Sequence, residues 1–95
     1  MATHSPLTVK LVAVEAQIWE GEASSVYART TEGELGVYPG HIPMLGEVAV
    51  DSNVHLYTTE GERLDFEVTG GFISITADGV TVLAESARQV EAATA

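Results

Sequence analysis

The chain has 95 residues, 45% of them hydrophobic, which is the size and composition of one globular domain. The absence of cysteine excludes disulfide bonds, a cysteine-ligated zinc site and a thiol nucleophile. Four basic residues against 14 acidic ones give a net charge of −10, which repels phosphate backbones, so we expect no nucleic-acid partner.

The first half of the chain alternates apolar and polar residues with the period of two that is typical of strands. Residues 1–6 precede this pattern, lack the basic and apolar regions of a signal peptide, and are expected to form a flexible N-terminus. In residues 7–13 the side chains of Leu7, Val9 and Leu11 share one face. No run of about 18 apolar residues occurs, so direct membrane insertion is not expected. Further strands are expected at residues 17–20, 23–31 and 34–37.

The second half continues as strands separated by glycine-containing turns. Residues 63–68 show the clearest alternation, with apolar side chains inward and Arg63 and Asp65 outward. The Gly70-Gly71 pair is expected to interrupt the strand pattern. Further strands are expected at residues 47–51, 54–59, 72–76 and 80–84.

Many short strands, with turns about every 8–12 residues, predict an all-β protein. We expect a flattened antiparallel β-sandwich of about ten strands, in which two layers bury two alternating faces. The sandwich domain is expected to span residues 7–84. Residues 85–95 contain good helix formers but are too few and too polar for a stable isolated helix. They predict a C-terminal tail or, at most, a short helical stub.

The residues that could support catalysis or metal binding do not form a recognisable site. The three histidines, His4, His41 and His55, are too far apart in the chain for an H-x-H metal pair on one strand. No G-x-S-x-G elbow is present, and the glycines match neither a dinucleotide nor a P-loop pattern. We therefore expect no catalytic residue, no cofactor and no metal.

The stretch GELGVYPGHIPMLGE, residues 33–47, is unusually apolar for a loop and holds two of the three prolines. Its residues Ile42, Met44 and Leu45 either fold under the loop as a small satellite core or point outward as an interface patch. The residue pattern favours neither outcome. His41 is a surface imidazole in both, either solvated or in contact with a partner.

Two motifs resemble one family. EGELGVYPGHIPML, residues 32–45, resembles the signature of the ε subunit of F-type ATP synthases, and VTGGFISITADGVTVLAESA, residues 68–87, resembles that family's later strands and hairpin. The resemblance covers residues 7 to 88. It implies a β-sandwich that the family follows with a C-terminal helical hairpin, which is missing here. The hairpin's restraint of ATP hydrolysis, and its ATP binding in some members, are therefore not carried over.

The resemblance also implies a function. The family's sandwich is a non-catalytic rotor subunit of the central stalk, which links the γ subunit to the c ring and supports coupling of proton flow to ATP synthesis. On this resemblance Glu32, Gly33 and Glu34 face the c ring. The residues that match the region near γ are His41, Ile42, Met44 and Leu45. The chain would then be peripheral to the membrane, on its cytoplasmic face if the source is bacterial.

Two alternatives come from other classes of protein. A free-standing β-sandwich that binds a carbohydrate or another ligand would expose several coplanar aromatic rings, whereas the six aromatic residues of this chain are scattered. A small β-barrel enzyme would need a cleft that contains titratable groups with perturbed pKa values.

Overall fold

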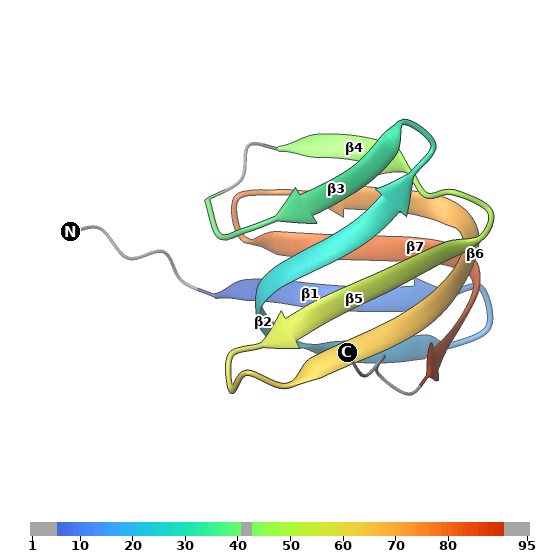
Figure 1. Cartoon of the computed structure of the whole chain (residues 1–95). Coiled ribbons are helices and arrows are strands. Elements are labelled where there is room, and N and C mark those ends of the chain that lie inside the picture. Colours follow the sequence, from blue (N-terminus) through green and yellow to red (C-terminus); the bar gives the residue numbers. More distant parts are fainter. Residues whose placement is uncertain (1–5, 41–42, 91–95) are drawn as a thin grey trace.

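A computed structural model describes residues 6–40 and 43–90, and within these ranges every regular element is a strand. The all-β prediction is confirmed. The seven strands, labelled in Figure 1, are β1 (Leu7–Ala13), β2 (Gln17–Thr30), β3 (Gly33–Val37), β4 (Met44–Glu47), β5 (Ser52–Thr58), β6 (Arg63–Ile75) and β7 (Gly79–Val90).

The strand pairings close into a ring. The order is β1–β7–β6–β5–β2, and β1 pairs with β2 in turn. Two short strands lie off the ring, because β3 extends from β2 and β4 extends from β6. Figure 1 shows β3, the second half of β2 and β5 in front of a second layer that contains β4, β7 and β1. The ring is thus flattened into the two layers of a sandwich.

The strands number seven rather than the expected ten, because three long strands each serve both layers. β2, β6 and β7 have 14, 13 and 12 residues. β2, for example, pairs first with β1 and then with β5 and β3. The Gly70-Gly71 pair does not end β6. Its positive φ angles, 64° and 122°, let the strand bend from one layer into the other without a break.

The structure differs from the expected antiparallel sandwich at one pairing. β1 and β7 run parallel, whereas the other named pairs are antiparallel. The close approach of these two strands depends on Gly79, because a Cβ there would overlap the carbonyl oxygen of Thr8. The sandwich is therefore a mixed sheet.

β7 also runs past the boundary expected for the domain. Residues 85–90 continue the strand instead of beginning a tail, and Val90 still pairs with Asp65 of β6. The helix-forming composition of this segment is overridden by the cross-strand partners that β6 supplies. Residues 1–5 and 91–95, where a flexible N-terminus and the rest of the tail were expected, lie outside the described residues.

The core lies between the two layers and is made of the inward side chains of the alternating strands. Burying a large apolar side chain contributes roughly 1.5–3 kcal/mol, so these residues hold the layers together. Because these side chains fill the space between the layers, three surfaces are open to other molecules. They are the outer face of each layer and the rim formed by β3 and β4. The largest fully buried side chains belong to Phe66, Leu7, Leu11, Leu56, Ile73 and Ile75.

Candidate interaction surfaces

The predicted acidic turn is an exposed and well-braced hairpin between β2 and β3. Glu32, Gly33 and Glu34 are all exposed. The hydroxyl of Thr30 donates to the carbonyl oxygen of Gly33 at 2.7 Å and accepts the Glu32 N–H at 3.2 Å. Gly33 has a φ of 125°, which favours glycine at this position. The turn thus presents two exposed carboxylates on a braced backbone.

The structure decides between the two possibilities for the apolar residues after the loop. Leu45 is 69% exposed and Met44 is 39% exposed, so neither is buried in a satellite core, although as successive residues of β4 they face opposite sides of the strand. The predicted contact residues His41 and Ile42 lie outside the described residues. Met44 and Leu45 therefore form an exposed apolar pair on a strand that extends the sheet at β6.

The acidic turn and the apolar pair share one groove. It has a volume of about 350 Å³. We call it the β3–β4 groove. Sequence reasoning gave the two groups to different partners and did not predict that they would lie together. The groove is lined by Thr30, Thr31, Glu32, Gly33, Glu34, Leu35, Met44, Leu45, Gly46 and Glu47.

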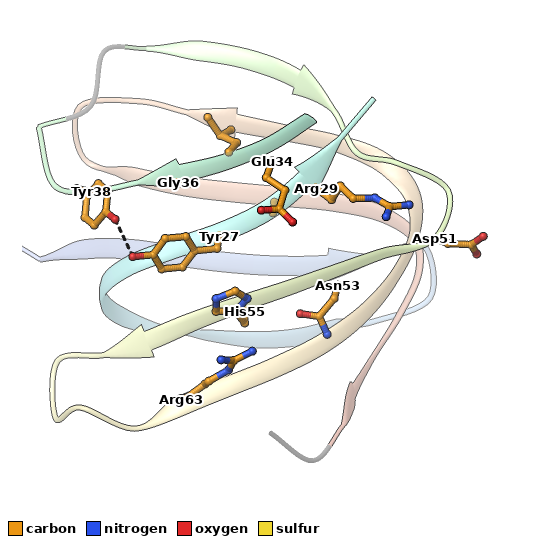
Figure 2. A pocket seen from close by; sticks show the side chains of 11 residues that line it. Tyr27, Arg29, Glu34, Gly36, Tyr38, Asp51, Asn53, His55 and Arg63 are labelled. Carbon is orange, nitrogen blue, oxygen red and sulfur yellow. Dashed lines mark hydrogen bonds between the residues drawn. The ribbon is translucent and has the colours of Figure 1, made fainter. Parts of the chain in front are cut away.

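A second hollow, on the outer face of the β3–β2–β5 layer, was missed by sequence reasoning. It has a volume of about 660 Å³ and is shown in Figure 2. Tyr27 stacks on His55 with ring centroids 4.8 Å apart, and its hydroxyl lies 2.7 Å from that of Tyr38. Tyr57 meets both rings of the stack edge-on. Tyr27, Tyr38 and His55 therefore line the hollow, and Tyr57, the third tyrosine of the chain, packs beside them.

The signal for this cluster is weak in the sequence. Tyr27, His55 and Tyr57 occupy outward positions of β2 and β5, which alternation can identify. Only the register shows that Tyr27 lies opposite His55, and that His55 lies opposite Asp65. Cross-strand register depends on long-range pairing, which a single sequence does not reveal.

Charged groups at one side of the hollow are already paired. Arg63 donates to both oxygens of Asp65, at 2.7 and 3.0 Å, and Asp65 is only 3% exposed. Hydrogen bonding from Arg63 lowers the pKa of the Asp65 carboxyl and raises the pKa of Arg63 itself. Burial lowers the pKa of His55, and the positive charge of Arg63 lowers it further. The site therefore favours the uncharged form of the stacked His55 ring.

The arrangement in this hollow suits recognition better than catalysis. Among its lining residues no serine, threonine or lysine stands beside His55 to act as a nucleophile. The edge-on tyrosines, with interplanar angles of 87° and 88°, do not make the flat aromatic platform that a carbohydrate module would use. Tyrosine and arginine are, however, enriched where proteins make strong contacts.

The described residues provide neither a metal site nor a membrane-spanning helix. Within residues 6–40 and 43–90, no group of three or more histidines, aspartates and glutamates could hold a metal ion. Over the same two ranges there is no helix with the length and hydrophobicity needed to cross a membrane.

Comparisons with known proteins point to one family. The family model for the β-sandwich domain of the ATP synthase delta/epsilon chain matches residues 6–90. The ATP synthase epsilon chain of Rhodococcus opacus (strain B4) is 53% identical over 85 residues, which are 90% of this chain and 70% of that one. The epsilon chain of Frankia casuarinae is 47% identical over 83 residues, which are 87% of this chain and 96% of that one.

Solved structures share the fold. A chain of the Euglena gracilis mitochondrial ATP synthase, in a structure of the OSCP, F1 and c-ring, aligns with a TM-score of 0.84 and 20% identity, covering 93% of this chain and 56% of that chain. A chain of the Tetrahymena thermophila mitochondrial ATP synthase central stalk and c-ring aligns with a TM-score of 0.70 and 14% identity, covering 90% and 68%. By its sequence and its fold, the chain belongs to the family of the β-sandwich domain of the ATP synthase delta/epsilon chain.

Proposed function

We propose that the chain is a non-catalytic rotor subunit of the central stalk of an F-type ATP synthase. In this role it links the γ subunit to the c ring and supports the coupling of proton flow to ATP synthesis. The observation that carries the proposal is its match to epsilon chains over residues 6–90, with 53% identity to the Rhodococcus protein. The two structural neighbours agree with it, because one comes from an assembly with the c-ring and the other from a central stalk and c-ring.

The acidic turn is the proposed contact with the c ring. Glu32 and Glu34 are exposed on a braced hairpin, so they can meet basic and polar loops of a partner without a change in the turn backbone. Charge complementarity of this kind mainly sets the specificity and the rate of association. Gly33 contributes the turn geometry that places the two carboxylates.

The proposed contact with γ is the apolar pair Met44 and Leu45, together with His41 and Ile42, which remain a sequence-based expectation. A specific interface buries on the order of 1,600 Å² in total. A few buried anchors supply most of its binding energy, at about 2 kcal/mol or more each. Exposed apolar side chains on a regular strand suit such anchors, because the strand fixes their direction before the partner binds.

A rotor subunit needs attachment rather than reactivity. Torque passes through it only while it stays bound, so durable contacts take the place of a catalytic group. We place the chain at the periphery of the membrane as part of the synthase complex, on the cytoplasmic face of a bacterial cell membrane. The high identity to epsilon chains of Rhodococcus and Corynebacterium supports a bacterial source.

The decisive experiment mixes the chain with the purified γ subunit of the same organism and measures co-elution by size exclusion. We expect a stable complex. A chain that is folded by circular dichroism and yet elutes alone would count against the rotor role.

The chain supplies its own control for the c-ring contact, because it contains two Glu-Gly-Glu hairpin turns. Residues 60–62 form the β5–β6 turn, at the opposite corner of the layer from residues 32–34 (Figure 1). Glu34→Lys should weaken the binding of the complex between this chain and γ to a detergent-solubilised c ring about five- to tenfold. Glu62→Lys makes the same charge change and should leave binding unaltered. Equal losses in both variants would mean that net charge, not the turn, matters.

A further inference from the structure

Two strands of the molecule have an open edge. Within the described residues β4 pairs only with β6, and β3 pairs only with β2. An open edge presents a row of unpaired backbone N–H and C=O groups, to which another strand can add. Both open edges border the β3–β4 groove, which closes where Thr30 bridges to Val48 and backbone hydrogen bonds join Thr31 to Glu47 and Ala49 to Arg29. The open part of the β4 edge is therefore at Leu45.

The hydrogen bonds identify which backbone groups face the groove. On the β6 side, the Val48 N–H donates to the carbonyl of Gly71 at 2.9 Å. On the other side, the carbonyl of Glu47 accepts the N–H of Thr31 at 3.0 Å. Successive residues of a strand direct their backbone groups to alternate sides. Leu45 therefore points its N–H and C=O away from β6, at the open edge.

The side chains around this edge indicate what could bind there. Leu45 and Met44 offer apolar surface, while Glu32, Glu34 and Glu47 line the same groove with three carboxylates. None of the three is in an ion pair within the part of the chain that is described. A second copy of the chain would bring the same carboxylates against this edge, and with a net charge of −10 it would be repelled.

We propose that the open edge of β4 receives an extended segment of the γ subunit, which adds to the sheet as a further strand. The segment carries a lysine or arginine for Glu47, the carboxylate on β4 itself, and an apolar residue for Leu45, while Glu32 and Glu34 are left to the c ring. Backbone hydrogen bonds to Leu45 hold it in register. The proposal rests on the proposed function, since it specifies how the stalk partner binds.

The first test measures hydrogen exchange at single amides of the ¹⁵N-labelled chain, alone and with purified γ subunit. Among the described residues the Leu45 N–H points away from β6 and has no strand partner, so it should exchange at least about 100-fold more slowly in the complex. The Glu62 N–H at the other hairpin, which donates to the Thr58 hydroxyl at 3.0 Å, is a control, because it lies away from the groove and its exchange should not change.

The second test compares two substitutions at one position. Proline at an edge position removes a single outward N–H and leaves the β6 ladder intact. Leu45→Ala removes the side chain only. Leu45→Pro should therefore bind γ about tenfold more weakly than Leu45→Ala, because the partner's carbonyl is left unpaired.

The outcomes separate this inference from the function on which it rests. If γ binds but the Leu45 amide is not slowed, or if the proline and alanine variants bind equally, strand addition is wrong and the rotor role stands. Slow exchange that appears without γ and grows with chain concentration would mean that a second copy occupies the edge. If the folded chain does not bind γ at all, both proposals fail. Should Leu45→Pro not fold, the exchange measurement decides alone.

Discussion

The closed ring of strands and the β3–β4 groove are built in opposite ways. In the ring, every strand has a neighbour on each side and buries its inner side chains, such as Phe66 and Leu11. Around the groove, each strand has one neighbour, and Leu45 and the carboxylates are exposed. The residues that stabilise the fold are therefore different from the residues that can contact a partner. Substitutions should therefore affect one property without the other.

The largest effect is expected in the ring. Phe66 and Phe72 lie on the same strand, but Phe66 is fully buried and Phe72 is 52% exposed. Phe66→Ala should cost about 3–5 kcal/mol of unfolding free energy, because it leaves a cavity. Phe72→Ala should cost less than about 1 kcal/mol. Urea unfolding of both variants measures the difference, and similar losses would mean that the layers are not packed as described.

The next effect is expected on binding, with little change in stability. Met44→Asp places a charge on the exposed apolar pair at the groove. It should weaken binding of γ by about 30-fold, the equivalent of one anchor residue. The melting temperature should fall by no more than a few degrees, about what 1 kcal/mol produces in a domain of this size. Calorimetry of the isolated chain and titration with γ check the two parts, and a collapse of the fold would make Met44 a core residue.

A third prediction concerns the ring's paired charges. Asp65→Asn weakens the two hydrogen bonds that Arg63 makes. Breaking a fully buried pair costs about 3–5 kcal/mol. Because the Arg63 side chain is 32% exposed and partly screened, we expect a loss nearer 2 kcal/mol. Guanidinium unfolding at neutral pH measures it, with Glu67→Gln, which removes an exposed pair with Arg88, as the control. Equal costs in both would contradict the burial of Asp65.

The smallest effect is a dependence of stability on pH. The pKa of His55 is lowered in the fold by burial and by Arg63, although Asp65 and Glu34 oppose this. The unfolded chain therefore binds the proton more readily. His55 contributes stability above its unfolded pKa of about 6.5, and this is lost as the pH falls through the lower folded value. Unfolding free energies at about pH 7.5 and pH 5.5 should differ less in His55→Gln than in the parent chain, and an unchanged difference would exclude His55 as the cause.

The alternation of apolar and polar residues predicts much of the fold, but it does not predict which strands pack beside a given residue. Residues 63–68 lie in a strand with Asp65 on the outward side, as the sequence indicated. Asp65 is nevertheless buried, because Arg63 covers it and Val90 pairs beside it. The period of two gives the direction of a side chain, whereas the elements that pack around it depend on register. For the same reason the sequence predicts a break at Gly70-Gly71, where β6 instead bends.

The candidate site divides in the same way. Local sequence identified the acidic turn and the apolar residues after the loop, since glycine, proline and unusual hydrophobicity are local signals. It could not decide whether Met44 and Leu45 are buried. Nor could it place them in one groove with Glu34, because β3 and β4 belong to different layers. The tyrosine and histidine cluster needed three strands in register and was not predicted.

The parallel pairing of β1 with β7 affects how the chain is made. Thr8, near the start, pairs with Gly79, near the end of the described residues, so the ring cannot close until almost the whole domain has left the ribosome. Contacts between distant segments form slowly, on the scale of milliseconds to seconds for all-β domains. During synthesis, the edge of β1 that pairs with β7 stays unpaired until β7 has been made. A binding partner or chaperone that reaches the nascent chain before then would find this edge accessible.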